Sequence, residues 1–297
     1  MIPFKPVTID DKDIIEPFFN KSTFRNCDFS FPNIFAWKGL YNTTFAIEDG
    51  YLYIRFHVAT DSSGYLFPLG EGNLKLAIER IMQDAKARQN EFRLSSVTPE
   101  MFDLIEAAMP GQFHYEKQRH WYEYIYSSGD LIHLVGKRYQ AKRNHINKFK
   151  RTYEWEYLPI TQEIIPDCLK LYNRWYEESS SSGLMQSLIE ERIGTQQVFD
   201  NYQKLGLVGG ALRIDGEILA YSYGRPLTHD TFGVHAEKCL HSIHGGFTMI
   251  NQQFAEHNCS NYPYINREED LSVDSLRQAK MSYHPAFLLE KGKVQLK

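Results

Sequence analysis

The sequence predicts an α+β protein that is built from two domains. The chain has 297 residues, which is long for a single average domain. Its hydrophobic share of 42% and charged share of 24% are close to globular averages, so a packed core can form. Both halves alternate short strand-like runs with amphipathic helical patterns, and the order loosely repeats. We therefore expect domains at residues 1–128 and 129–297, with the chemistry in the second.

Composition and charge exclude several classes of protein. The net charge is −4, so any contact with nucleic acid has to rest on a local basic patch. The four cysteines form no CxxC pair, which argues against a zinc ribbon and against a disulfide framework. The N-terminal residues are acidic, and no window of about 20 apolar residues exists. We expect a soluble, cytoplasmic protein without a transmembrane helix.

The first half mixes helices with strands. Apolar residues at helical spacing predict four helices, two of them preceded by the capping residues Asn73 and Thr98. Glu48-Asp49-Gly50 between two strand-like runs indicates a hairpin. The expected helices are Asp10–Ser22, Phe29–Tyr41, Asn73–Gln89 and Glu100–Met109, and the expected strands are Phe45–Ile47, Tyr51–Val58, Tyr65–Leu69, Phe92–Val97 and most of Phe113–Tyr126.

The second half begins with a basic segment, Asp130–Tyr153. Lys137–Arg151 holds seven Lys and Arg residues and no acid. In a helix, Arg138 and Lys142 fall within its apolar stripe, where a charge is unfavourable unless it is paired or reaches solvent. Either this is a solvated helix whose two inward cations pair with acids from elsewhere, or it presents cations to an anionic substrate such as a phosphate or an RNA backbone. The apolar positions expected in the stripe are Leu131, Val135, Tyr139, Ile146 and Phe149.

The rest of the chain predicts two helices and then an antiparallel meander. Asp215-Gly216 between two strand-like runs is a strong signal for a type I′ hairpin. The serine-rich segment 179–183 is expected to be a mobile loop between the two helices. The expected helices are Thr161–Glu178, Leu184–Leu205, Phe247–His257 and Asp274–Met281, and the expected strands are Trp155–Leu158, Gly209–Ile214, Glu217–Tyr223, Thr231–Glu237 and Tyr262–Ile265.

A glycine turn and a charged turn are the candidate sites in this half. His244, Gly245 and Gly246 precede a helix, and such a turn offers free N–H groups and a positive dipole to an anion. The charged turn 266–270 follows a strand, so Asn266 and Arg267 stand where that strand opens. Acids at a helix start also have an ordinary capping role. The histidines at 235, 241 and 244 match no metal-binding spacing, so we expect no metal.

The order hairpin, strand, glycine loop, helix, strand and helix resembles the core of the GNAT (acyl-CoA N-acyltransferase-like) fold. The phrases YLFPLGEG (65–72), KRNHINKFKR (142–151), LVGGALRIDG (207–216) and YINREEDL…LRQAKMSYHP (264–285) are similar to the bacterial DUF2156 family, which is related to the C-terminal domain of phosphatidylglycerol lysyltransferases. This resemblance implies two GNAT-like domains in tandem, each a mostly antiparallel sheet flanked by helices. It also implies relationship to Fem-type aminoacyltransferases, which move an amino acid from aminoacyl-tRNA to an amine or hydroxyl.

The resemblance also implies roles for particular residues. Glu268 or Asp270 would orient or deprotonate the acceptor amine, and Tyr283 would protonate the leaving oxygen. Arg267 and Lys280 would hold anionic groups. The other expected substrate-binding residues are Arg138, Lys142, Arg143, His145 and Asn266, and the expected donor-binding residues are His244, Gly245 and Gly246. A core tyrosine that ends a helix is the structural alternative for Tyr283.

Two departures shape the expected function. Aligned on Gly245, the pyrophosphate signature of acetyl-CoA enzymes meets Ser242 and a bulky Phe247, so one position of three matches. This favours aminoacyl-tRNA over acyl-CoA as co-substrate, with no tightly bound cofactor. The chain also lacks the large membrane region of the lipid-modifying lysyltransferases, which argues against a lipid acceptor. The alternatives are an acetyl-CoA-dependent N-acetyltransferase and a non-catalytic tRNA- or RNA-binding protein.

Overall fold

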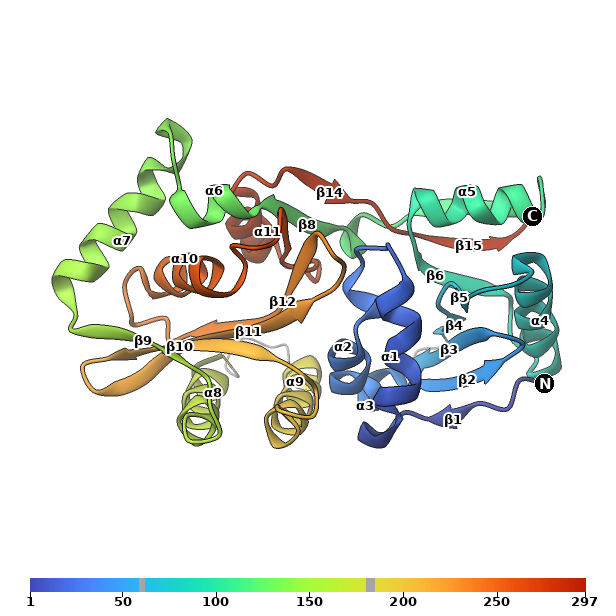
Figure 1. Ribbon diagram of the computed structural model, residues 1–297, viewed down its shortest axis with the longest axis horizontal. Helices are drawn as coiled ribbons and strands as arrows, with labels where there is room; N and C mark the ends of the chain where they lie inside the picture. Colours follow the sequence, from blue (N-terminus) through green and yellow to red (C-terminus); the bar gives the residue numbers. More distant parts are fainter. Residues whose placement is uncertain (59–61, 180–184) are drawn as a thin grey trace.

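The computed structural model describes residues 1–58, 62–179 and 185–297, which form two sheets placed side by side along the long axis of the molecule (Figure 1). Helices α1 (Lys12–Lys21), α2 (Phe31–Ala36) and α3 (Lys38–Tyr41) lie between the sheets. The two chain termini lie at the same end of the molecule, beside the first sheet. No helix in the described ranges is both long and apolar enough to cross a membrane.

The first sheet has the strand order β1-β2-β3-β4-β6-β15-β7, with the short β5 beside β3, among the residues described. Helices α4 (Leu74–Ala87) and α5 (Pro99–Ala108) accompany it, and buried Ile78, Ile81 and Ile105 join them to the core. Its strands are β1 (Lys5–Pro6), β2 (Thr44–Glu48), β3 (Tyr51–Val58), β4 (Ser62–Tyr65), β5 (Leu69–Gly70), β6 (Arg93–Val97), β7 (Phe113–Lys117) and β15 (Gly292–Leu296).

The second sheet has the order β14-β8-β13-β12-β11-β10-β9 and is antiparallel except where β12 runs parallel to β13. Helix α10 (Gly246–Asn258) covers one face, and α8 (Ile165–Ser179) and α9 (Met185–Asp200) cover the other (Figure 1). The strands are β8 (Glu123–Ser127), β9 (Trp155–Pro159), β10 (Val208–Ile214), β11 (Glu217–Pro226), β12 (Thr231–Cys239), β13 (Tyr264–Asn266) and β14 (Phe287–Leu289), and the remaining helices are α6 (Ser128–His133), α7 (Gln140–Thr152) and α11 (Asp274–Met281).

The two sheets exchange strands across the predicted domain boundary. Strand β8 comes before residue 129 but pairs with β13 and β14 of the second sheet. Strand β15 comes near the end of the chain but pairs with β6 and β7 of the first sheet. The domain boundary after residue 128 stays a prediction. The sheets do not follow it, because each sheet contains one strand from the opposite side of this boundary.

Turn and capping predictions are confirmed. Both hairpins have two consecutive residues with positive φ, as type I′ turns require: Asp49 and Gly50 at 50° and 79°, and Asp215 and Gly216 at 50° and 89°. The predicted cap Thr98 accepts a hydrogen bond from the third residue of α5.

Other local predictions need correction. The helix predicted over Phe29–Tyr41 is two short helices, because the chain breaks at Trp37. The strand predicted over Tyr65–Leu69 overlaps two short strands at its ends only. Val135 is 72% exposed, because the basic segment bends between α6 and α7 and does not continue as one helix. Residues 180–183 of the predicted serine-rich loop, and Leu184 after them, lie outside the described residues.

Candidate functional site

The candidate site is organised around the loop that follows β13. Strands β12 and β13 pair as far as Gly233 and Asn266, and beyond this point they diverge. The buried ammonium of Lys280 donates to the carbonyl oxygens of Arg267 at 2.6 Å and Glu268 at 3.2 Å, and also to that of Glu269. These three bonds fix the loop, so Lys280 has a structural role here.

The two ends of the loop are also held by buried polar contacts. The side chain of Asn266 accepts from the Glu268 N–H at 2.8 Å and donates to the Arg25 carbonyl at 2.9 Å. Asp270 accepts from Tyr124 Oη at 2.6 Å and from Arg277 Nε at 2.8 Å. Burial alone would raise the pKa of Asp270, but hydrogen bonds from Arg277 and Tyr124 lower it to about 2. Asp270 is therefore placed as a fixed anion and is unsuited to act as a base.

Two cations meet one tyrosine next to this loop, in a group that we call the cation–tyrosine cluster: Lys142, Glu237, Arg267 and Tyr283. The Lys142 ammonium lies 3.7 Å from the centre of the Tyr283 ring, and the Arg267 guanidinium carbon lies 5.0 Å from it. Arg267 Nη2 donates to Glu237 Oε1 at 3.0 Å. The cluster thus joins α7, β12, the loop after β13 and the residue two positions past α11.

The electrostatics of the cluster favour an anion. Two cations face one carboxylate, and Arg267 Nη1 is buried without a hydrogen-bond partner among the described residues. Burial, together with the charge of Arg267, lowers the pKa of Lys142 to about 8. Burial raises the pKa of Tyr283 to about 12, although the charge of Arg267 opposes this. Tyr283 thus remains a proton donor at neutral pH, and an anionic group would satisfy the free guanidinium N–H.

Two other predicted substrate-binding cations lie outside the cluster. Arg138 is half-exposed and pairs with Asp130 at 2.8 Å. Arg143 donates to the carbonyls of Leu134 and Gly136, and so closes the bend before α7. Of the two cations predicted to lie in the apolar stripe, Arg138 and Lys142, Lys142 belongs to the cation–tyrosine cluster.

The glycine turn has a packing explanation. Gly245 has φ 79° and stands at the start of α10, where a Cβ would lie 2.8 Å from the His145 carbonyl oxygen. The rings of His145 and His244 are 5.4 Å apart, and burial lowers the pKa of His145. The His244 N–H donates to Tyr153 Oη at 3.2 Å. Helix α7 therefore covers the start of α10, and the glycine permits this close contact.

Glu268 takes part in a contact that the sequence did not indicate. Its Oε1 lies 2.8 Å from His235 Nδ1, and His235 Nε2 lies 3.0 Å from Ser30 Oγ. Ser30 is 205 positions from His235 in the sequence, so no local pattern connects them. The sequence pointed to His235 only as a metal ligand to be excluded.

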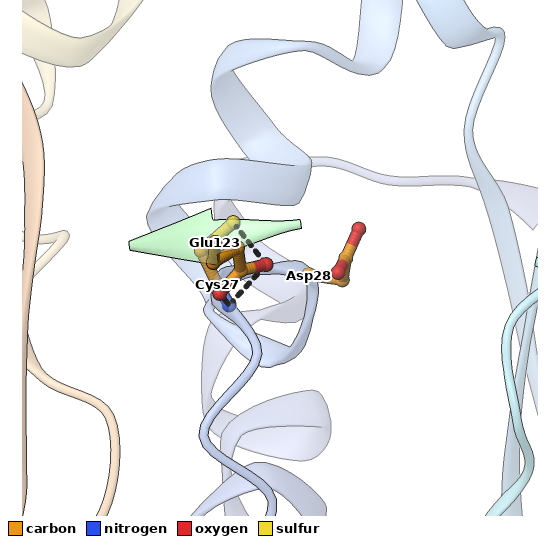
Figure 2. A group of neighbouring side chains, drawn as sticks. All are labelled: Cys27, Asp28 and Glu123. Carbon is orange, nitrogen blue, oxygen red and sulfur yellow. Dashed lines mark hydrogen bonds between the residues drawn. The ribbon is translucent and has the colours of Figure 1, made fainter. Parts of the chain in front are cut away.

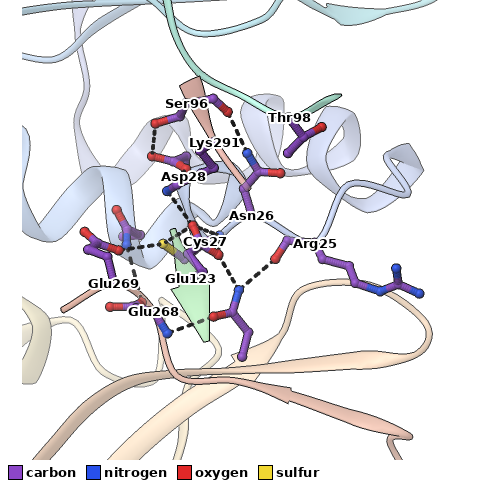
Figure 3. A network of polar contacts seen from close by, with 12 residues as sticks. Arg25, Asn26, Cys27, Asp28, Ser96, Thr98, Glu123, Glu268, Glu269 and Lys291 are labelled. Carbon is purple, nitrogen blue, oxygen red and sulfur yellow. Dashed lines mark hydrogen bonds and ion pairs between the residues drawn. The ribbon is translucent and has the colours of Figure 1, made fainter. Parts of the chain in front are cut away.

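A second buried polar group lies on the other side of the loop. Cys27, Asp28 and Glu123 place a thiol and two carboxylates close together (Figure 2). Lys291 Nζ lies 2.8 Å from Asp28 and 2.5 Å from Glu123, so an ammonium already neutralises this cluster (Figure 3). Burial, with the Glu123 charge, raises the pKa of the Cys27 thiol, which keeps it protonated. The residues present therefore do not suit a metal ion.

The chain is similar over most of its length to proteins of a known family. The family model described as the C-terminal part of phosphatidylglycerol lysyltransferase matches residues 19–291. A crystal structure of a conserved protein from Bacteroides thetaiotaomicron is 42% identical over all of both chains, with a TM-score of 0.94. An uncharacterized protein of Mycoplasmoides gallisepticum is 25% identical over 176 residues, which are 58% of this chain and 56% of that protein. The chain thus spans little more than half of that relative.

More distant solved structures share the fold. The L-PGS structure from Bacillus licheniformis has a TM-score of 0.65 at 16% identity and covers 96% of this chain and 91% of its own. The structure of FemX has a TM-score of 0.62 at 9% identity and covers 99% of this chain and 96% of its own. The predicted architecture of two GNAT-like domains in tandem is confirmed.

Proposed function

The chain belongs to the family of phosphatidylglycerol lysyltransferase C-terminal domains, and from this we propose that it is an aminoacyltransferase that uses aminoacyl-tRNA as its donor. The acceptor would be an amine or a hydroxyl group. The donor would be a co-substrate that leaves after each turnover, and no tightly bound cofactor is required. The observation that carries the proposal is the cation–tyrosine cluster beside the diverging strands β12 and β13.

The cluster supplies what transfer from an activated ester needs. The acceptor attacks the ester carbonyl carbon, the bond from that carbon to the ribose oxygen breaks, and the leaving oxygen takes a proton. In this proposal Arg267 Nη1, which has no hydrogen-bond partner among the described residues, stabilises negative charge on the carbonyl oxygen or on a neighbouring phosphate. We propose that the Tyr283 phenol, whose pKa is raised to about 12, gives this proton.

Lys142 contributes charge and a means of proton transfer. Its ammonium donates to Ser282 Oγ at 2.7 Å as well as lying over the Tyr283 ring. With a pKa lowered to about 8, it exchanges a proton close to neutral pH. Lys142 therefore replaces Asp270 among the residues that we propose to move protons during transfer, because the carboxylate of Asp270 is held by Arg277 and Tyr124.

The outer side of α7 supports tRNA as the donor. Lys148, Lys150 and Arg151 are exposed on the same helix whose inner side carries Lys142. Exposed cations of this kind attract a phosphate backbone through counterion release. One helix would thus hold the tRNA on its outer side and contact the reacting ester through Lys142. The close packing of Gly245 against α7 weakens the acyl-CoA alternative, because α7 covers the turn that would cradle a pyrophosphate.

The test combines binding with transfer. Nitrocellulose filter binding compares radiolabelled aminoacyl-tRNA with acetyl-CoA, and thin-layer chromatography follows the label into a panel of amine, peptide and phosphatidylglycerol acceptors. We expect aminoacyl-tRNA to bind with a steep salt dependence and the label to enter one acceptor class. Binding of acetyl-CoA alone would support the acetyltransferase instead. Binding of charged and uncharged tRNA without transfer would indicate a non-catalytic RNA-binding protein.

A charge-reversal variant tests the proposed tRNA surface separately. Changing Lys148 and Lys150 to Glu should weaken tRNA binding and flatten its salt dependence. The same reversal at Lys75 and Lys86 on α4 is the matched control, because that helix accompanies the first sheet. Equal loss in both variants would remove α7 from the proposal.

A further inference from the structure

Ser30, His235 and Glu268 form a linear chain of hydrogen-bonding groups. Ser30 Oγ lies 3.0 Å from His235 Nε2, and His235 Nδ1 lies 2.8 Å from Glu268 Oε1. Asn33 Nδ2 approaches the same glutamate oxygen at 3.5 Å. The three residues come from the start of α2, from β12 and from the loop after β13, so only the folded chain brings them together.

The order of these contacts sets the direction of proton movement. An ionised carboxylate can only accept, so Glu268 fixes the imidazole proton on Nδ1. His235 Nε2 then presents its lone pair to the Ser30 hydroxyl. This is the arrangement of a nucleophile, a base and an orienting acid that activates serine in acyl transfer, and it is recognised by geometry and not by sequence order.

Ser30 and Glu268 both contact His235, and each has a local arrangement that is unusual for its residue type. Ser30 stands at the N-cap of α2, yet its hydroxyl makes no capping hydrogen bond to the helix and contacts His235. Glu268 has φ 57°, a left-handed conformation that is costly for a non-glycine residue and is common at functional sites. The contacts of Asn266 and Lys280 with its backbone hold this conformation.

The chain of groups lies where the second sheet opens. His235 and Glu268 each stand two residues past the last pairing of β12 with β13. Ser30 also lines a cavity of about 10 Å³, which has room for about one water molecule, together with Glu16, Asn20, Arg225 and Leu227. Ser30 is 3% exposed, and the described contact of its hydroxyl is with His235 Nε2.

We propose that Ser30 is a nucleophile that accepts an acyl group from an activated ester, with His235 as its base and Glu268 as the positioning residue. Ser30 Oγ forms a bond to the ester carbonyl carbon, its proton passes to His235 Nε2, and the carbon–oxygen bond of the ester breaks. His235 gives that proton to the leaving alcohol. Water or an amine then attacks the acyl-serine, loses a proton to His235, and the serine hydroxyl is restored.

This activity uses none of the cation–tyrosine cluster, so variants of that cluster distinguish it from the aminoacyl transfer proposed above. The test uses p-nitrophenyl acetate with the full chain. Release of p-nitrophenolate is followed by absorbance, and the acetylated residue is found by peptide mass spectrometry after an acid quench. We expect a burst of product and an acetyl group on Ser30. Ser30→Ala and His235→Gln should each reduce acetylation by about a hundredfold or more.

Glu268 is tested by a readout that a purely structural role would leave unchanged. Glu268→Gln should slow acylation and shift its pH profile, and Glu268→Asp should recover part of the rate. Ser128→Ala is the matched control, because Ser128 is also buried and its hydroxyl has no partner in the described part of the chain. This variant should be acetylated on Ser30 as the parent protein is.

Thermal unfolding shows whether each variant is folded. If alanine at position 30 disturbs α2, Ser30→Gly replaces Ser30→Ala, because glycine is also a favourable N-cap residue. A folded parent protein without acetyl on Ser30 overturns the proposal. Equal bursts from the parent protein and the folded Ser30 variant also overturn it. In either case the three residues serve only to attach α2 to the second sheet.

Discussion

The ammonium group of Lys142 lies 3.7 Å from the centre of the Tyr283 ring, across a contact between α7 and the end of α11. This contact turns one cation of a basic helix toward the interior, while Lys148 and Lys150 stay at the surface. The same ring also faces Arg267. A tyrosine between two cations is stabilised by their attraction to its π-electrons, and it brings them close enough to share one anionic ligand.

Removing either cation of the cluster should reduce aminoacyl transfer. Arg267→Met or Lys142→Met removes a charge that would stabilise the transition state, and one such donor is typically worth about 10²–10³ in rate. Single-turnover transfer from labelled aminoacyl-tRNA measures the loss. Arg80→Met on α4 is the control, since Arg80 pairs with Glu48 in the first sheet. A loss of the same size in the control would point to a general effect of charge.

Lys142 should make stability depend on pH. Its pKa is lowered from 10.5 to about 8, so the folded chain binds fewer protons than the unfolded chain between these values. Its contribution to stability therefore rises with pH across this window. Urea unfolding of the parent protein and Lys142→Met at pH 7.5 and pH 10 should show the variant gaining less with pH. Parallel changes in both proteins would contradict the burial of this ammonium.

Glu269 should make stability fall as pH rises, which is opposite to the effect of Lys142. Burial raises its pKa from 4.5 to about 7 against the attraction of Lys291, and the charges of Glu268 and Glu123 add to the effect. The folded chain then binds more protons than the unfolded chain, so the contribution of Glu269 falls as pH rises through about 7. Glu269→Gln should match the parent protein near pH 5 and exceed its urea midpoint at pH 8. Glu100→Gln, at an exposed position, should show no such crossover.

Asp270→Asn should destabilise the fold at neutral pH. The pKa of Asp270 is lowered to about 2, so its stabilising effect is complete above about pH 4 and is lost as pH falls through about 2. The substitution removes the buried carboxylate that accepts hydrogen bonds from Tyr124 and from the partly exposed Arg277, so it should lower the urea midpoint at pH 7. Asp274→Asn, in the first turn of α11, should cost less than about 1 kcal/mol. A penalty for Asp270→Asn that persists unchanged at pH 2 would argue against this ion pair.

Comparing Gly245→Ala with Gly111→Ala should separate the effect of close packing on the free energy of unfolding from the effect of backbone strain. Alanine at φ 79° costs about 1–2 kcal/mol for its conformation alone, and its Cβ would also lie 2.8 Å from the His145 carbonyl. Gly111 has nearly the same φ of 73°, but nothing lies within 4 Å of its Cβ position. Gly245→Ala should therefore lower the free energy of unfolding by more than Gly111→Ala. Equal losses of unfolding free energy in the two variants would show that α7 moves away from the added Cβ without an energetic penalty.

The sequence allowed accurate prediction wherever a local signal decides the structure. Asp49-Gly50 and Asp215-Gly216 made both hairpins predictable, because few residues adopt positive φ. The ends of α11 agree with the prediction for the same kind of reason, since apolar spacing and Pro285 bound it. The GNAT-like order of elements in the second half is likewise local information.

Much of the candidate site could not be predicted, because it is built from contacts between residues that are far apart in the sequence. Lys142 was singled out because a cation stood in an apolar stripe, and the structure explains this by its contact with Tyr283. Glu237 and Ser30 gave no such signal, and their roles come from pairing with Arg267 and His235 across more than one element. Asp270 was predicted to orient or deprotonate the acceptor amine, because the sequence does not show that Tyr124 and Arg277 are its hydrogen-bond partners.

The exchange of β8 and β15 has a consequence for biosynthesis. Strand β15 lies between β6 and β7, so the first sheet stays divided until residues 292–296 have left the ribosome. Until β15 has been made, the facing edges of β6 and β7 in this sheet therefore stay unpaired. A ribosome that stalls before β15 would therefore leave a chain whose first sheet cannot close.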